Sequence, residues 1–208
     1  MPLFMTFEGG EGSGKSVQTR ALYRRLVRRD IPALLTHEPG GTPFGERVGR
    51  WLKWVKQVEI SPLAELMLFN ASRAQLVRDV IRPGLNSGKV VICDRWADST
   101  MAYQSYGRGL DLATVEMVNN AATQGLKPSL TVLLDIAVEA GLARKQGERP
   151  DRFEKEDLLF HRRVREGYLK LAAIEPERWL VIDAARPRKE IGEIIWQRVD
   201  GLLSPGKG

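Results

Sequence analysis

The stretch LFMTFEGGEGSGKS at residues 3–16 runs from a short apolar segment into a glycine-rich turn and on into a helix-like sequence. Residues 9–16 fit the pattern G-x-x-x-x-G-K-[ST], and they lie between a predicted strand at 3–8 and a predicted amphipathic helix at 15–29. Glycines let successive backbone N–H groups turn toward an anion, and the helix N-terminus adds a positive dipole end. The stretch therefore predicts a phosphate-binding loop.

Charged side chains in and near this loop have separate expected roles. Lys15 is expected to reach the β- and γ-phosphates of a nucleotide, and Ser16 to bind Mg²⁺. Asp94 ends a buried strand and is the second expected Mg²⁺ ligand, although it could instead cap a helix. Glu11 should point away from the phosphates that would repel it, toward an acceptor, unless it is a solvated loop-tip residue. The predicted ATP-binding residues are Gly9, Gly10, Glu11, Gly12, Ser13, Gly14, Lys15 and Ser16.

Outward from the loop, apolar strand-like runs alternate with amphipathic segments. This alternation predicts an α/β fold with a parallel sheet of about five strands and helices on both faces, in one domain over residues 1–208. The charge-rich segment at 141–154 predicts a small lid, and Pro83-Gly84 is expected to end a helix that begins at Ser61-Pro62. The remaining predicted strands are 33–36, 89–93, 129–136 and 179–183, and the remaining helices 112–124, 139–146, 157–173 and 191–203.

Composition excludes several classes of protein. Cys93 is the only cysteine, so no intrachain disulfide forms, and His37 and His161 lack the spacing of metal ligands. No apolar run is long enough to span a membrane, so we expect a cytoplasmic enzyme with no membrane partner. The net charge of +6 is compatible with a polyphosphate or a nucleic acid as partner and does not choose between them.

The remaining motifs resemble the thymidylate kinase family, in that family's order along nearly the whole chain. They read FEGGEGSGKS at 7–16, THEPGGT at 36–42, FNASRAQ at 69–75, DRW at 94–96, STMAYQ at 99–104, GRG at 107–109 and DRFE at 151–154. The resemblance implies a P-loop NTPase fold and Mg²⁺-dependent transfer of the ATP γ-phosphoryl to dTMP, in dTTP biosynthesis. It also implies a homodimer, for which the helix after Ser61 and residues 110–118 are candidate interface segments. Two residues depart from the pattern: His37 stands where the family usually has Arg, and Trp96 where Tyr or His is common.

The resemblance also implies how the acceptor is bound. Phe69 and Arg73 lie four residues apart and share a helix face, so that Phe69 could stack on a pyrimidine while Arg73 donates to a base carbonyl. Arg95 is expected to bind the acceptor phosphate bidentately. Tyr103 matches the residue packed under the deoxyribose. The predicted dTMP-binding residues are Glu11, Glu38, Pro39, Phe69, Arg73, Arg95, Ser99, Thr100, Tyr103 and Gln104.

Arginines for the transferring phosphoryl group should come from outside the loop, because residues 10–13 include none. The lid resembles the arginine-bearing lid of bacterial-type members of the family. Adenine contacts are expected from Arg144 and residues 184–188. Alternatively, the lid is a charged, solvent-exposed loop whose positive charge is partly balanced by Glu148, Asp151 and Glu154. The predicted catalytic residues are Lys15, Arg95, Arg144, Arg149 and Arg152.

The sequence is compatible with two other functions. A kinase that acts on dUMP, CMP or a nucleoside is the nearest one, and a nucleoside acceptor would need a base such as Glu8 or Glu38. An ATP-dependent switch or a nucleic-acid-binding ATPase is the second. The chain has neither GTPase signatures nor the aromatic–basic stripe of single-strand binding, so we expect no nucleic-acid partner.

Overall fold

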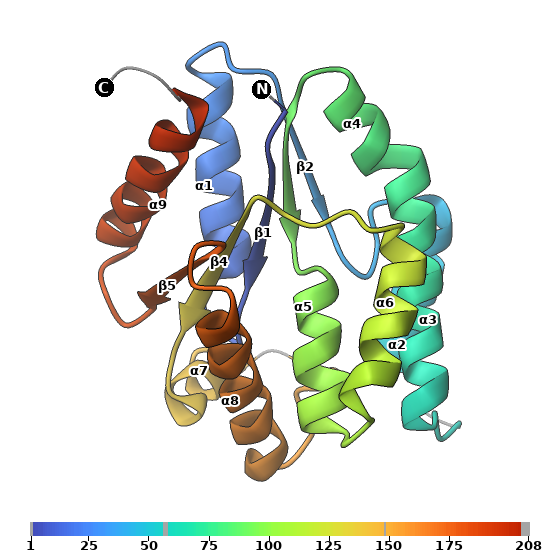
Figure 1. The fold of residues 1–208 in the computed structure, drawn as a ribbon. Coiled ribbons are helices and arrows are strands. Elements are labelled where there is room, and N and C mark those ends of the chain that lie inside the picture. The colour runs from blue at the N-terminus through green and yellow to red at the C-terminus, as the bar shows by residue number, and fades with distance from the viewer. Residues whose placement is uncertain (1, 56–57, 148, 205–208) are drawn as a thin grey trace.

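A five-stranded parallel sheet forms the centre of the computed structural model, which describes residues 2–55, 58–147 and 149–204. The strand order is β2-β3-β1-β4-β5, so the phosphate loop follows the central strand (Figure 1). The predicted α/β fold is confirmed. The strands are β1 Phe4–Glu8, β2 Ala33–His37, β3 Val90–Asp94, β4 Leu130–Asp135 and β5 Trp179–Asp183.

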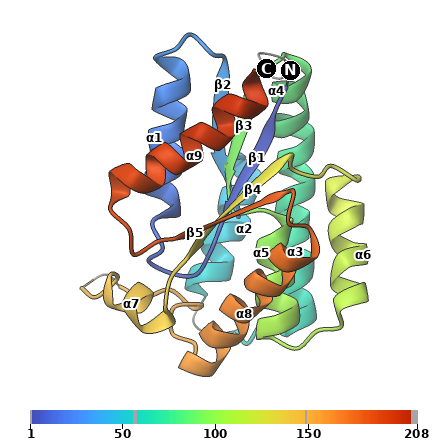
Figure 2. The ribbon, with the colours of Figure 1, turned by 60° about the vertical axis from the view of Figure 1, so that its left-hand side comes forward.

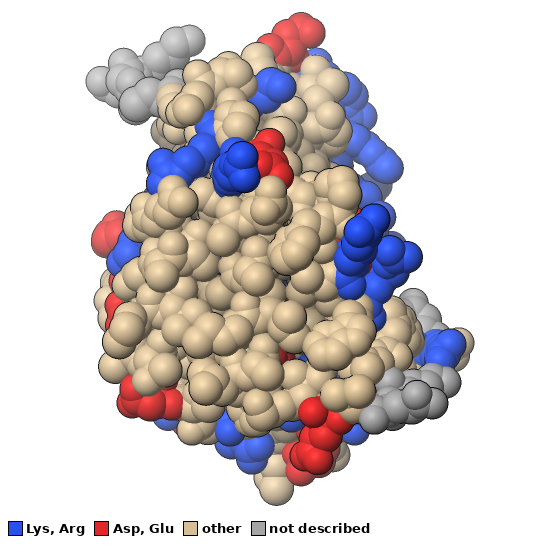
Figure 3. Space-filling view, turned by 90° about the vertical axis from the view of Figure 1, so that its right-hand side faces the viewer, with Lys and Arg blue, Asp and Glu red and all other residues tan. Residues whose placement is uncertain are grey.

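Helices cover both faces of the sheet. The first and last helices, α1 and α9, lie together on one face, and most of the others lie on the opposite face (Figure 2). The side of the molecule on which α3 and α6 lie carries few charged side chains at its centre (Figure 3). The helices are α1 Lys15–Val27, α2 Pro43–Trp54, α3 Pro62–Leu76, α4 Arg82–Asn86, α5 Ala97–Thr100, α6 Leu112–Thr123, α7 Val138–Ala143, α8 Leu158–Ile174 and α9 Arg188–Leu203, with π-helical turns at Val77–Ile81 and Met101–Gly107.

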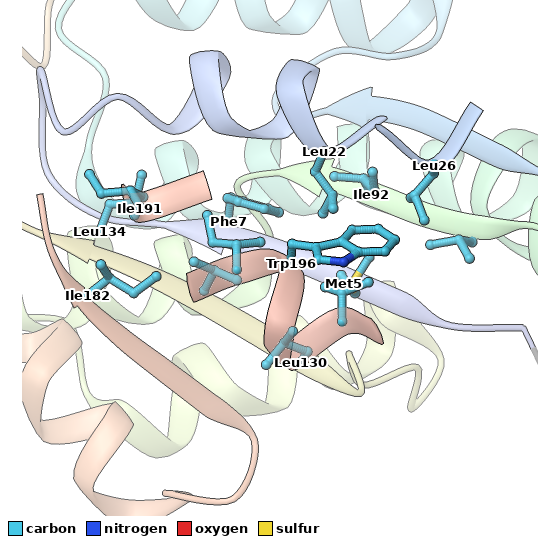
Figure 4. Packing of buried hydrophobic residues seen from close by; sticks show 14 of the residues in the cluster. Met5, Phe7, Leu22, Leu26, Ile92, Leu130, Leu134, Ile182, Ile191 and Trp196 are labelled. Atoms are coloured by element: carbon cyan, nitrogen blue, oxygen red, sulfur yellow. The ribbon is translucent and has the colours of Figure 1, made fainter. Parts of the chain in front are cut away.

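Two apolar clusters fix these layers to the sheet. On the α1/α9 side, Trp196 packs among Met5, Phe7 and Leu22, all of them buried (Figure 4). On the other side, Phe4 meets the buried Trp96 edge-on, with ring centroids 5.1 Å apart. Successive β1 side chains thus point to opposite faces, as strand geometry requires. No helix of the described residues is long and apolar enough to cross a membrane.

The helix that begins at Pro62 does not end at Pro83-Gly84, and that prediction is wrong by about one turn. A π-helical turn at Val77–Ile81 leads directly into α4, which continues to Asn86. Pro83 follows the π-helical turn by one residue, and the helix continues past it although its nitrogen donates no hydrogen bond. Gly84 is buried against β3, since a Cβ there would lie 3.1 Å from Val91 Cγ2. The helix therefore continues past Pro83 and Gly84 because Gly84 packs closely against the sheet.

Two helical segments were not anticipated from the sequence. Helix α2 is capped by the preceding residue, Thr42, whose Oγ1 accepts the N–H of Gly45 at 2.9 Å. The second segment, α5 with its following π-helical turn, spans residues 97–107 directly after the DRW motif. Both segments border the cleft described next.

Candidate active site

A cleft of about 820 Å³ opens at the carboxyl edge of the sheet. It is lined by residues 11–18 of the phosphate loop and α1, by the ends of β2 and β3, and by side chains from α3 and α5. Residues 144, 145, 151, 153 and 154 of the lid close one side. Segments separated by more than a hundred residues thus meet where ligands bind in open parallel sheets.

The phosphate loop surrounds the ammonium of Lys15. Its Nζ donates to the Gly9 carbonyl at 2.9 Å, to the Gly10 carbonyl at 2.7 Å and to Ser13 Oγ at 3.2 Å. Burial lowers the pKa of Lys15 to about 8. Gly12 has φ +65°, and a Cβ there would lie 2.0 Å from the Gly141 carbonyl oxygen. The loop therefore needs glycine both for its conformation and for its contact with α7.

Ser16 and Asp94 lie side by side at the mouth of this loop. Ser16 Oγ donates to Asp94 Oδ2 at 2.5 Å. A hydroxyl and a carboxylate beside a phosphate site form a hard oxygen pair that fits Mg²⁺, which commonly takes one or two protein ligands and completes its shell with phosphate and water. No cluster of three or more His, Cys, Asp or Glu side chains within the described ranges provides a separate metal site.

Arg95, Glu11 and Tyr103 form a connected group on the acceptor side of the loop. Arg95 Nη2 donates to Glu11 Oε1 at 2.8 Å, and the Tyr103 hydroxyl donates to the same oxygen at 2.7 Å. Burial alone would raise the pKa of Glu11, but the charges of Arg95 and Lys15 outweigh it and hold that pKa at about 2. Glu11 thus points toward Arg95 and Tyr103.

Arg73 is buried, and the protein itself satisfies all five of its N–H donors. The guanidinium binds Glu38 bidentately, with its shortest contact at 2.7 Å. Its other donors reach Asn70 at 3.0 Å, Asn119 at 2.7 Å and Thr100 at 2.8 Å. Although Arg73 lines the cleft, a base carbonyl would have to share or displace one of these acceptors.

Aromatic side chains form one wall of the cleft. Phe69 lies tilted against Phe153 with ring centroids 5.7 Å apart, and Tyr103 meets Phe153 edge-on at 6.1 Å. Phe153 belongs to a quoted motif, but it was not among the predicted site residues. Gln104 lines the cleft while its Nε2 donates to the buried Glu65 at 2.7 Å. Four more of the predicted dTMP-binding residues line the cleft: Glu38, Pro39, Ser99 and Thr100.

The three predicted lid arginines occupy different environments. Arg144 lines the cleft, where it donates to the Ala184 carbonyl at 3.1 Å and to the Gly12 carbonyl at 3.4 Å. Arg149 lies over the ring of Trp54, 5.3 Å from its centroid. Arg152 donates to the Leu52 carbonyl at 2.9 Å and to Glu65 at 2.5 Å. Only Arg144 of the three lines the cleft, and Glu148 lies outside the described residues.

His37 and Trp96, the two residues that depart from the family pattern, both contact other side chains at the cleft. His37 lines the cleft with its Nε2 3.0 Å from Glu46 Oε1, so it pairs with α2 across the turn at 38–42. Trp96 is fully buried, and its ring lies beneath Arg73, whose guanidinium carbon is 5.4 Å from the ring centroid. Trp96 therefore supports the Arg73 group from below.

Arg152 acts in this structure as an anchor between the lid and α3. Replacing it with alanine removes one charged partner from the fully buried Glu65 carboxylate, which keeps Gln104 and Arg108. We expect Arg152→Ala to lower the free energy of unfolding by about 1–3 kcal/mol, measured by urea titration. Arg50→Ala, at an exposed position of α2, serves as the matched control. Equal stabilities of the two variants would rule out the anchoring role.

Comparisons with known proteins identify relatives over nearly the whole chain. The family model described as thymidylate kinase matches residues 7–195. The thymidylate kinase of Dehalococcoides mccartyi is 56% identical over 203 residues, which is 98% of each chain, and that of Deinococcus radiodurans is 51% identical over 95% of this chain and 96% of that one. The crystal structure of thymidylate kinase from Ehrlichia chaffeensis superposes with a TM-score of 0.76 at 31% identity, covering 97% of this chain and 98% of that one. The chain belongs to the thymidylate kinase family.

Proposed function

We propose that this chain transfers the γ-phosphoryl group of ATP to dTMP, giving dTDP and ADP for dTTP biosynthesis. The observation that carries the proposal is that the phosphate loop and the Arg95–Glu11–Tyr103 group open into one cleft. A donor phosphate and an acceptor nucleotide can therefore meet there. The chain acts as a single kinase domain, with residues 141–154 as its lid.

The donor is held by the phosphate loop. Backbone N–H groups of residues 9–16 surround its phosphates, and Lys15 leaves its carbonyl partners to reach the β- and γ-oxygens. Ser16 and Asp94 hold Mg²⁺, their contact at 2.5 Å supporting this role. Mg²⁺, when bound, neutralises charge on the β- and γ-phosphates. Arg144 is the lid arginine that lines the cleft, and its contact with the Gly12 carbonyl supports a role beside the transferring phosphoryl group.

The acceptor phosphate is already anionic, so positioning and charge stabilisation provide the rate enhancement without a general base. Arg95 binds that phosphate with its planar fork. Glu11 accepts a hydrogen bond from the 3′-hydroxyl, and Tyr103 packs under the sugar, where a 2′-hydroxyl would clash. Phe69 stacks on the thymine ring, supported by the aromatic wall that Phe69 and Phe153 form.

A phosphate acceptor fits this cleft better than a nucleoside. Glu38, one candidate base, is bound bidentately by Arg73. Glu8, the other candidate, is fully buried and does not line the cleft. Neither carboxylate is placed to take a proton from a 5′-hydroxyl.

The test is ADP release with ATP, Mg²⁺ and one acceptor at a time: dTMP, dUMP, UMP, CMP or thymidine. We expect the highest kcat/KM with dTMP, a lower value with UMP because of Tyr103, and no turnover with thymidine. Turnover with thymidine alone would refute the acceptor assignment. Hydrolysis of ATP that no acceptor stimulates would leave only the phosphate loop standing.

We also propose that the protein is a homodimer. The outer face of α3 and α6 carries the exposed side chains Leu63, Met67, Leu112 and Met117, of which Met117 is 69% exposed. The same face is largely free of charged residues (Figure 3). Exposed apolar side chains gathered on one face mark association sites in soluble proteins, and these four lie on the segments that the sequence suggests for the interface.

Met67→Glu should convert the dimer to a monomer of 23.4 kDa, because it buries an unpaired charge at the interface. Sedimentation velocity would measure the mass. Ile174→Glu is the matched control, since Ile174 is 71% exposed on α8, away from this face. If both variants keep the mass of the wild type, α3 is not at the interface.

A further inference from the structure

Glu8 is a fully buried carboxyl group at the end of β1, behind the cleft. Its Oε1 accepts the backbone N–H of Trp96 at 2.8 Å. Its Oε2 lies 2.5 Å from Ser99 Oγ and 3.1 Å from the Tyr168 hydroxyl oxygen. Those two hydroxyl oxygens lie 2.8 Å from each other. Three oxygens from β1, α5 and α8 therefore form a closed triangle.

The number of protons in this triangle decides the state of Glu8. Each of the three O···O contacts lies at hydrogen-bond distance and needs a proton of its own. Ser99 and Tyr168 supply one proton each. An ionised Glu8 would supply none, so one edge would bring two sets of lone pairs together. A neutral Glu8 supplies the third proton, and each oxygen then donates once around the ring.

The contacts of Arg95 agree with this arrangement. Its Nη1 lies 3.4 Å from both Ser99 Oγ and the Tyr168 hydroxyl. Each hydroxyl has two lone pairs, so it can accept one hydrogen bond within the ring and one from Arg95. The triangle therefore touches the guanidinium that we assign to the acceptor phosphate.

Groups from every neighbouring element bear on the charge of Glu8. The pKa of Glu8 is raised to about 8, because burial and the charge of Asp98 on α5, which raise it, outweigh Ser99, Arg95 and the Trp96 N–H, which lower it. Asp98 is ion-paired with Arg178 at 2.7 Å, and Arg95 with Glu11. Lys15 on α1, Cys93 on β3 and Tyr168 on α8 are the other titratable groups that feel its charge.

We propose that Glu8 is a positioning residue that works as a neutral carboxylic acid, its proton closing a hydrogen-bond ring with Ser99 and Tyr168. Its other oxygen fixes the peptide of Trp96 and thereby holds Arg95 in its left-handed conformation, at φ +69°. The inference rests on the proposed function only in giving Arg95 the acceptor phosphate. The state of the proton is independent of that role.

The first test compares the unfolding of wild-type protein and Glu8→Gln across pH. A glutamine keeps the acceptor for the Trp96 N–H and a donor toward the two hydroxyls, and it is uncharged at every pH, so it serves as a non-titrating reference for the neutral form. Between the ordinary pKa of 4.5 and about 8, the folded protein would hold a proton that the unfolded chain has lost. Stability contributed by this proton is present at low pH and is lost as pH rises.

We therefore expect the unfolding equilibrium constant of the wild type, divided by that of Glu8→Gln, to rise by about tenfold per pH unit between pH 5 and 8. Below pH 4 the ratio should be constant. A ratio that does not change with pH would show that Glu8 is ionised in the folded protein, and the proposal would fail whatever the enzyme's substrate.

The second test measures kinetics at pH 7. Glu8→Ala should lower kcat/KM for dTMP by about a hundredfold while the KM for ATP stays constant, because the Arg95 segment loses its support. Glu8→Gln should restore most of that loss. Equal losses in the two variants would overturn the positioning role. Absence of dTMP turnover in the wild type would instead contradict the proposed function, and the unfolding ratio would still decide the state of Glu8.

Discussion

Lys15→Ala should lower kcat with ATP and dTMP by about a thousandfold, a loss comparable to that of other cations at a transferring phosphoryl group. Lys15 Nζ is the charge at the centre of the phosphate loop, with three oxygens of the loop within 3.2 Å. Alanine leaves the backbone N–H groups of the loop in place but removes the cation that stabilises the charge on the transferring γ-phosphoryl group. Single-turnover formation of ADP at saturating dTMP would measure the effect.

The same variant should unfold at a temperature close to that of the wild type. Burial lowers the pKa of Lys15 from 10.5 to about 8, so its charge opposes folding at pH 7. That penalty is relieved only as pH rises from about 8 toward 10.5. Removing the charge therefore offsets the lost hydrogen bonds. Lys127→Ala, whose side chain is 71% exposed, is the control and should keep full activity. Activity retained in Lys15→Ala would refute the phosphate-loop assignment.

The sheet could be predicted because its signals are local. Each strand is a short apolar run that ends at glycine, proline or a charged residue, and the expected bounds of β5 agree with the structure at both ends. Helix α2 could not be predicted in this way, because Gly45 and Gly49 weaken its helical propensity. A Cβ at Gly45 would lie 2.6 Å from the Gly40 carbonyl oxygen, and one at Gly49 2.9 Å from that of Pro39. Close packing on the turn at 38–42 needs those glycines, and no local pattern reveals it.

In the candidate site, too, residues in local motifs could be predicted, and residues placed by distant contacts could not. The residues of the phosphate loop were predicted from the motif itself and those of the 94–104 segment from the resemblance to the family, and both segments line the cleft. Asn119 and Tyr168 were missed, since each lies on a helix whose sequence shows only ordinary amphipathic spacing. Their roles arise from partners 46 to 160 residues away in the chain. The position of Arg152 likewise depends on Glu65, whose burial no neighbouring residue signals.

Arg95→Ala is expected to keep the fold and to lower turnover of dTMP by about a thousandfold. Alanine is no more strained than arginine at φ +69°, so the backbone conformation should not change. The pKa of Glu11 should rise from about 2, because Arg95 is its strongest counter-charge. The loss should fall on kcat and on the KM for dTMP, while ATP binding, measured by calorimetry, stays near the wild-type value.

Two further variants separate charge from geometry at this position. Arg95→Lys keeps the charge but not the planar fork that matches a phosphate, so it should recover only a small part of the activity. Arg162→Ala removes an arginine that is 59% exposed and paired with Glu139, and it should leave dTMP turnover unchanged. Full activity in Arg95→Lys would mean that a point charge suffices at the acceptor phosphate. Near-normal turnover in Arg95→Ala would mean that the acceptor phosphate binds elsewhere in the cleft. Arg144, the lid arginine that contacts the phosphate loop, would then be the next candidate to bind it.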